Sequence, residues 1–243
     1  MPVSSQRIDA SDAQPVQESL ARRAWTSRWR LFAATLALLA PLLPRAADGL
    51  GITESLLAQV REAYGRRSES ILRDWQELVA DNRGKSDDDK LSAVNRFFNR
   101  NIRFVDDDRH WRTTDYWATP LETMVTRGGD CEDFVIAKYF TLRELGVPDE
   151  RMRLTYVRAR RPNQAHMVLS YYPRPGAEPL VLDNLTGRIL PASRRDDLTP
   201  VYSFNGSSLW MAKERGGGRL AGSADNVNKW RMVRERMSRG GLP

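Results

Sequence analysis

The sequence predicts an α+β domain in which helices pack against an antiparallel sheet. Between residues 53 and 98, apolar side chains recur at spacings of three and four, as in helices with one buried face. Between residues 154 and 204, short apolar runs are separated by turn-rich segments, as in strands. Helices followed by closely connected strands favour an α+β arrangement. Hydrophobic residues make up 41% and charged residues 28% of the 243 residues, which is typical of a globular chain with a real core.

Three helices are predicted before the strands. Thr53 is expected to cap the first, which ends near Gly65. The second carries its apolar residues between positions 71 and 79. The third follows the acidic run Asp87–Asp89, which we expect to serve as its cap, and extends to Phe98.

The remaining elements alternate between short strands and one strong helix. Residues 102–105 resemble a short strand before an acidic, aromatic loop, and residues 121–126 a short helical piece. Residues 130–145 form a strong helical pattern that Gly146 and Pro148 should terminate. Four further strands are predicted at residues 154–158, 166–172, 180–182 and 201–204.

Residues 1–47 have the three parts of an export signal. Arg28 and Arg30 precede an apolar run from Leu31 to Leu43, and small residues follow at 46 and 47. This run of 13 residues is shorter than the ~20 residues that a membrane span needs. The alternatives are an uncleaved membrane anchor and a buried core helix. Of the three, we expect an export signal.

The basic charge lies at the two ends of the chain. The net charge of +7 divides into +3 for residues 1–47, −1 for residues 48–212 and +5 for residues 213–243. The central domain at 48–212 is therefore almost neutral, which argues against a nucleic-acid partner. Residues 213–243 have a Gly-rich entry and one basic helical pattern with no evident partner face, so we expect a flexible tail.

The single cysteine is the most informative residue. One cysteine excludes an intramolecular disulfide and a multi-cysteine zinc site, and two histidines exclude a His-rich metal centre. Cys131 follows Gly128 and Gly129 at the predicted start of the 130–145 helix. The glycines would allow a sharp bend and close access for a substrate. The helix N-terminus favours a thiolate and offers N–H groups to an oxyanion.

A thiol nucleophile needs a base and a group that orients the base. His166 begins a predicted strand, whereas His110 lies in an acidic loop and is expected to face solvent. Asp183 follows the next predicted strand and should lie beside His166. A lone cysteine is, however, more often an inert buried residue. Residue types alone therefore leave a catalytic site and a buried thiol both open.

Three motifs resemble the bacterial transglutaminase-like cysteine proteinases, in particular the periplasmic members that release giant biofilm adhesins. The motifs are residues 128–133, 165–169 and 182–184, and the segments 116–122 and 202–210 are also similar. The resemblance spans roughly residues 55–212. It implies a papain-like or transglutaminase-like core with Cys131 as nucleophile, His166 as base and Asp183 as orienting residue.

The carboxylates beside the cysteine have two interpretations. Asp130, Glu132 and Asp133 oppose ionisation of the thiol. They either cap the helix or bind a hard cation such as calcium. No EF-hand loop is present, and Asp115 and the Asp106–Asp108 run are possible extra ligands or plain loop charge. The resemblance implies a calcium site at Asp130, Glu132 and Asp133.

The predicted function is that of a periplasmic, calcium-dependent cysteine endopeptidase. The resemblance further implies cleavage near a di-alanine motif in the N-terminal region of a large surface adhesin. It also implies inhibition by an inner-membrane cyclic-di-GMP receptor. A transglutaminase or amide transferase with the same triad, and a non-catalytic binding module, are the alternatives; no nucleic-acid partner is expected.

Overall fold

The computed structural model describes residues 51–160, 163–212 and 218–240, all within one compact unit of the chain. The predicted export segment at 1–47 lies outside the described residues. No helix in the described part of the chain is long and apolar enough to cross a bilayer.

The three predicted N-terminal helices are present as α1 (Glu54–Tyr64), α2 (Arg66–Asn82) and α3 (Asp87–Asn101). The Thr53 hydroxyl caps α1 by accepting a hydrogen bond from the Leu56 amide at 3.2 Å. The cap of α3 differs from the prediction. Ser86 is the capping residue, and the acidic run occupies the first turn, where carboxylates complement the helix dipole.

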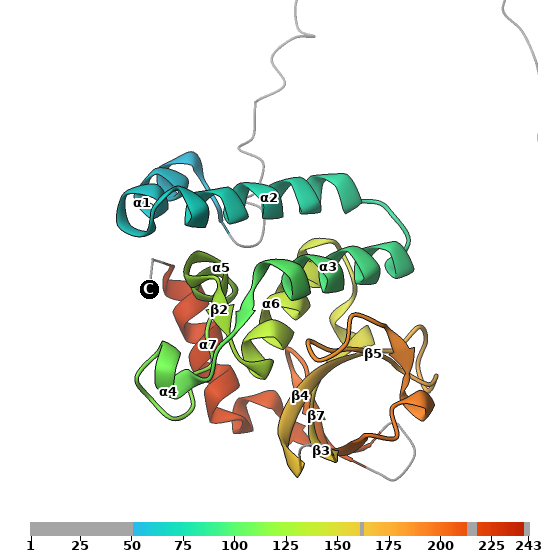
Figure 1. The fold of residues 1–243 in the computed structure, drawn as a ribbon. Helices are drawn as coiled ribbons and strands as arrows, with labels where there is room; N and C mark the ends of the chain where they lie inside the picture. The colour runs from blue at the N-terminus through green and yellow to red at the C-terminus, as the bar shows by residue number, and fades with distance from the viewer. Residues whose placement is uncertain (1–50, 161–162, 213–217, 241–243) are drawn as a thin grey trace, which may run out of the picture. The chain divides into compact units, whose positions relative to one another are not determined.

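Seven strands form one antiparallel sheet in the order β6-β5-β4-β3-β7-β8-β9. The strands are β3 (Met152–Arg160), β4 (Asn163–Tyr171), β5 (Leu180–Leu182), β6 (Leu190–Pro191), β7 (Leu198–Phe204), β8 (Ser208–Met211) and β9 (Arg219–Ser223). Each predicted strand from residue 154 onward falls within or overlaps one of them. Figure 1 shows the helices gathered beside this curved sheet, so the predicted α+β arrangement is confirmed.

The helix predicted at 130–145 is α6 (Cys131–Glu144), and it is central to the core. It packs against β3 and β4 on one side and against α3 and α5 (Pro120–Thr126) on others. Trp75 of α2 donates its indole N–H to Thr141 of α6 at 2.9 Å, inside the core. Burial on several sides fixes the position of the first turn of α6, which carries Cys131.

A small second sheet leads into α6. The strands β1 (Arg103–Phe104) and β2 (Gly128–Gly129) pair in parallel, and the short helix α4 (Asp107–His110) lies between them in the chain. The predicted strand at 102–105 is therefore confirmed as a two-residue strand.

The C-terminal segment differs from the predicted flexible tail. Residues 219–223 add β9 to the sheet edge, and α7 (Asn228–Arg239) packs on the core. Trp230 is fully buried and stacks on Phe140 of α6 at a centroid distance of 5.4 Å. The apolar stripe of this helix therefore does have a partner face, formed by aromatic residues of α6 and β7 that the local sequence pattern does not reveal.

Candidate active site and acidic cluster

Cys131 is the first residue of α6, directly after β2, as the sequence predicts. Asp130 has extended backbone angles and is the N-cap residue. The thiol therefore lies where the unpaired N–H groups of a helix begin. The side chain is partly exposed, and the cysteine is free.

The two glycines before the cysteine serve a different purpose from the predicted one. Neither Gly128 nor Gly129 has a positive φ, so no sharp bend requires them. A Cβ on Gly129 would lie 2.5 Å from a carboxylate oxygen of Asp133, and one on Gly128 would lie 2.8 Å from the His110 ring. The glycines are needed because these two side chains pack directly on the backbone.

His166 and Asp183 form a buried pair, as predicted from their neighbouring strands. His166 lies in β4 and Asp183 follows β5, and β4 and β5 are antiparallel neighbours. The ring Nε2 and the Asp183 Oδ1 are 2.8 Å apart, and the two residues are only 2% and 0% exposed. The carboxylate engages Nε2, so Nδ1 is the ring nitrogen that remains for a proton from a nucleophile.

A cleft of about 650 Å³ is lined by both the predicted nucleophile and the predicted base. Cys131 from α6 and His166 from β4 both line it, and Asp183 lies behind the imidazole. Trp117 forms part of the wall and stacks on Phe204 at 5.8 Å, so it serves both the cleft and the core. A thiol and an imidazole with a carboxylate hydrogen-bonded to it therefore lie at an accessible cleft, the set of groups that a thiol protease requires.

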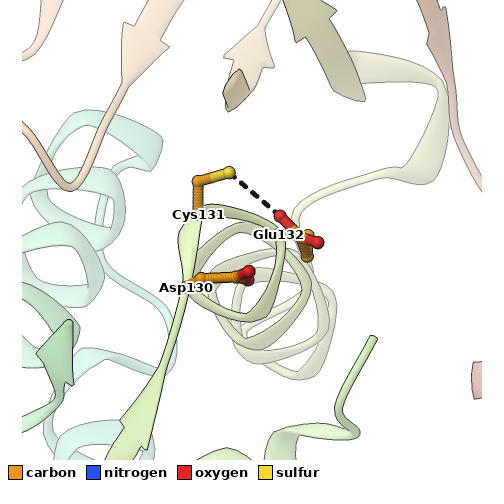
Figure 2. A group of neighbouring side chains, drawn as sticks. All are labelled: Asp130, Cys131 and Glu132. Atoms are coloured by element: carbon orange, nitrogen blue, oxygen red, sulfur yellow. Dashed lines mark hydrogen bonds between the residues drawn. The ribbon is translucent and has the colours of Figure 1, made fainter. Parts of the chain in front are cut away.

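The Cys131 thiol is hydrogen-bonded to its neighbour Glu132. The Cys131 Sγ donates a hydrogen bond to a Glu132 carboxylate oxygen at 2.9 Å (Figure 2). Burial raises the pKa of the thiol well above its ordinary value, and the Glu132 charge and hydrogen bond raise it further. A cation that neutralised the surrounding carboxylates would favour the thiolate of Cys131.

Carboxylates from three segments converge beside the thiol. Asp130 and Glu132 come from the start of α6, Asp107 from α4, and Asp115 from the loop after α4. Among the described residues, three overlapping groups have ligand atoms within 4.8 Å of one another: Asp107 with Asp115 and Glu132, Asp107 with Asp130 and Asp133, and Asp130 with Cys131 and Glu132. Of the acidic run at 106–108, only Asp107 belongs to the groups found among the described residues.

Asp107 and Asp130 are unfavourable as buried carboxylates without a counter-ion. Each has a buried Oδ1 with no hydrogen-bond partner. Burial raises the pKa of Asp107 to about 6. Burial and the charge of Glu132 raise the pKa of Asp130 to about 10. Oxygen ligands with unsatisfied lone pairs and mutual repulsion fit a hard divalent cation.

Asp133 has a structural role that distinguishes it from the other predicted ligands. Its Oδ1 accepts the Ala118 amide at 2.7 Å, and its Oδ2 accepts the Asp130 amide at 3.3 Å. Asp133 is fully buried and fixes the loop before α5 to the start of α6. The capping interpretation therefore holds for Asp133, and cation binding at Asp130 and Glu132 stays a prediction.

His110 is not the solvent-facing side chain that the sequence predicts. Its ring is half-buried, lies 2.9 Å from the Thr126 hydroxyl and packs edge-on against Trp111. Burial lowers its pKa. His110 does not line the cleft, so His166 is the base that the geometry supports.

Three residues that the sequence does not single out hold Asp183 in place. Arg195 donates to the Asp183 Oδ2 at 2.7 Å. Asn99 of α3 and Lys138 of α6 donate to the Asp183 carbonyl oxygen at 2.8 and 3.2 Å. Burial opposes ionisation of Asp183, but the His166, Leu185 and Arg195 hydrogen bonds lower its pKa to about 2. These donors come from distant segments, so no local sequence signal could have found them.

The buried Lys138 should make the stability of the protein depend on pH, and replacing Lys138 should remove this dependence. Its side chain is fully buried, and burial lowers its pKa to about 7. Between pH 7 and about 10.4 the unfolded chain binds more protons at this lysine than the folded chain does, so stability rises with pH. Between pH 7 and pH 9, the free energy of unfolding of the wild type should rise by about 2 kcal/mol more than that of Lys138→Met. Urea unfolding at both pH values tests this, and equal pH dependence in the two proteins would contradict it.

The comparisons with known proteins agree with this geometry. A family model described as the bacterial transglutaminase-like cysteine proteinase family matches residues 70–202. The solved structure of Legionella pneumophila LapG is 41% identical, with a TM-score of 0.66, over 76% of this chain and 98% of that one. A comparison with curated proteins gives no match.

Two further LapG structures concern calcium. One is described as calcium-bound and is 42% identical, with a TM-score of 0.66 over 76% of this chain and 99% of that one. The other is described as EGTA-treated and is 41% identical, with a TM-score of 0.67 over 76% of this chain and 98% of that one. The α+β fold predicted as transglutaminase-like is therefore confirmed. The chain belongs to the bacterial transglutaminase-like cysteine proteinases and is a cysteine protease.

Proposed function

We propose that this chain is an exported, periplasmic cysteine endopeptidase that requires calcium and cleaves the N-terminal region of a large surface adhesin. The observation that carries the proposal is the single cleft lined by Cys131 and His166, with Asp183 hydrogen-bonded behind the imidazole. The export pattern at 1–47 supports the location. By analogy with the adhesin-releasing members of the family, a cyclic-di-GMP receptor in the inner membrane would inhibit it.

In the proposed reaction Cys131 is the nucleophile, and His166 transfers protons in both acylation and deacylation. Nδ1 of His166 takes the thiol proton, and the Cys131 sulfur attacks a peptide carbonyl carbon. The N–H groups at the start of α6 stabilise the resulting oxyanion. The imidazolium returns its proton to the leaving amine as the C–N bond breaks. Water, deprotonated by His166, then hydrolyses the thioester and restores the thiol.

Asp183 keeps the His166 proton on Nε2, so that Nδ1 stays free to act as the base. A hydrogen bond from Arg195 keeps the Asp183 carboxylate ionised and fixed. The pair therefore needs no rearrangement when the imidazole becomes charged.

Calcium fits the acidic cluster on the chemistry of its donors. Asp130 and Glu132, with Asp107 and Asp115, would hold the ion, and Asp107 and Asp130 each offer an unpartnered oxygen. A bound cation would neutralise the charges that raise the pKa of the Cys131 thiol. The 42% identical relative described as calcium-bound supports calcium as the ion.

A cleavage assay tests the proposed function directly. The N-terminal region of a candidate adhesin is incubated with the protein in calcium and in EGTA, and the products are identified by mass spectrometry. We expect a new N-terminus only in calcium, and none with Cys131→Ala. Incorporation of an added primary amine in place of hydrolysis would instead establish a transferase. No reaction with any candidate, together with alkylation of Cys131 by iodoacetamide only after unfolding, would indicate a binding module.

Calcium should stabilise the protein against unfolding, and the effect should depend on Asp107 as a proposed ligand. At a calcium concentration 100 times the dissociation constant, stabilisation is about 2.7 kcal/mol, a rise in melting temperature of roughly 5–10 °C. Asp107→Asn should abolish most of this rise, because it removes a charge that faces the other ligands. Asp108→Asn is the matched control, since Asp108 is exposed and belongs to none of the clusters found among the described residues. A full calcium response in Asp107→Asn would exclude this cluster as the site.

A further inference from the structure

Arg195 lies behind the proposed triad, on the side of Asp183 that faces away from His166. It follows the 3-10 turn at Ala192–Arg194 and is only 7% exposed. A buried guanidinium is costly unless its N–H groups are paired. The Arg195 Nη2 donates to Asp183 at 2.7 Å and to Asp197 at 2.8 Å, whereas Nη1 is buried without a hydrogen-bond partner.

Asp197 fixes the plane of the guanidinium. The Arg195 Nε donates to Asp197 Oδ1 at 2.9 Å, while Nη2 donates to Asp197 Oδ2, so the contact is two-pronged. Such a pair defines orientation as well as distance. The Asp197 side chain is about half exposed, whereas the Asp183 side chain is fully buried. Arg195 therefore connects a carboxylate at the surface with the carboxylate of the proposed triad.

The two oxygens of Asp183 have different donors. Oδ1 is bonded to His166 at 2.8 Å and to the Leu185 amide at 3.0 Å. The hydrogen bond found on Oδ2 comes from Arg195. If that donor were removed, a buried carboxylate oxygen would lose its partner, and the carboxyl group would rotate or take up a proton. Either change weakens the acceptor that faces the imidazole.

We propose that Arg195 is a positioning residue that fixes the carboxylate of Asp183 and thereby the tautomer of His166. This inference rests on the proposed function, since it concerns the same triad. The charged groups that face Asp183 are His166 from β4, Lys138 from α6 and Arg195 itself. Lys138 contacts the backbone carbonyl, so it cannot replace Arg195 at the carboxylate.

The two histidines of the chain make a direct test practicable. In calcium-loaded protein labelled with 15N-histidine, NMR observes only His110 and His166. His110 bonds to Thr126, away from Arg195, and serves as an internal reference. We expect neutral His166 in wild type to carry its proton on Nε2. In Arg195→Met it should become a tautomer mixture, while the His110 signals stay unchanged.

Kinetics provide the second readout. Arg195→Met should lower kcat for adhesin cleavage by about 10- to 100-fold with little change in KM. Arg195→Lys should restore part of the loss, because a single donor can still reach Oδ2. Arg194→Met, at the exposed neighbouring position, is the control and should match wild type in both measurements. An unchanged His166 spectrum together with unchanged kcat in Arg195→Met would overturn the proposal.

A further variant covers the case in which Arg195→Met does not fold. Asp197→Asn leaves Arg195 in place but removes the charge that orients it, and should give a smaller change of the same kind in the His166 spectrum. An unchanged spectrum in Asp197→Asn would then count against the proposal. The NMR measurement needs no substrate. If wild type cleaves no adhesin but the spectrum changes as expected, the proposed function fails and the positioning role of Arg195 stands.

Discussion

Replacing Asp183 with Asn is expected to lower kcat by about 10⁴-fold, the size of effect typical of a catalytic triad that has the wrong histidine tautomer. The reason is that the two carboxylate oxygens of Asp183 have different partners, His166 and Arg195. Arg195 can only donate, so it would bind the new amide oxygen. The new NH₂ group would then face Nε2 of His166, which must become an acceptor. The ring proton would move to Nδ1, where it blocks transfer from Cys131.

The measurement is kcat at neutral pH, accompanied by thermal unfolding to separate chemistry from folding. Some loss of stability is also expected, because the Leu185 amide would face a donor in place of an acceptor. Asp196→Asn is the matched control, since Asp196 is exposed and close in sequence to Arg195. If Asp183→Asn retains activity within tenfold of wild type, Asp183 does not orient the base.

The placement of Cys131, His166 and Asp183 was predictable because it follows from local sequence patterns. A helix that begins at Asp130 or Cys131 places the thiol at its N-terminus, whatever the rest of the chain does. Two adjacent strand patterns joined by a turn-rich segment form an antiparallel pair, so residues near the paired ends lie side by side. His166 and Asp183 therefore meet at 2.8 Å as a consequence of the β4–β5 pairing.

The surroundings of the triad depend on tertiary contacts that no local pattern encodes. Asn99, Lys138 and Arg195 reach Asp183 from α3, α6 and the segment after β6. Of the three consecutive aspartates 106–108, only Asp107 is buried, and the position of α4 in the fold determines this. The pattern of α7 predicts an apolar stripe correctly, but its partner residues lie on β7 and α6, far away in sequence.

The packing of α7 leads to the largest stability effect that we expect from a single substitution. Trp230 is fully buried and contacts Tyr139, Phe140 and Phe204, with ring centroids 5.4 to 5.5 Å away. Trp230→Ala would remove this buried surface and leave a cavity between α6, α7 and the sheet. The expected loss of unfolding free energy is about 3–5 kcal/mol, a large part of the stability of a single domain.

Urea unfolding monitored by circular dichroism measures this loss. Met232→Ala on the same helix is the control, because Met232 is 49% exposed, and it should change stability by less than about 0.5 kcal/mol. The Trp230 substitution should also impair the cleft, since Val227, Asn228 and Lys229 at the start of α7 line it. A loss below about 1 kcal/mol would mean that α7 is not part of the cooperative core, because fully buried aromatic residues cost more to truncate. The C-terminal segment would then behave as the flexible tail that its Gly-rich entry and basic charge predict.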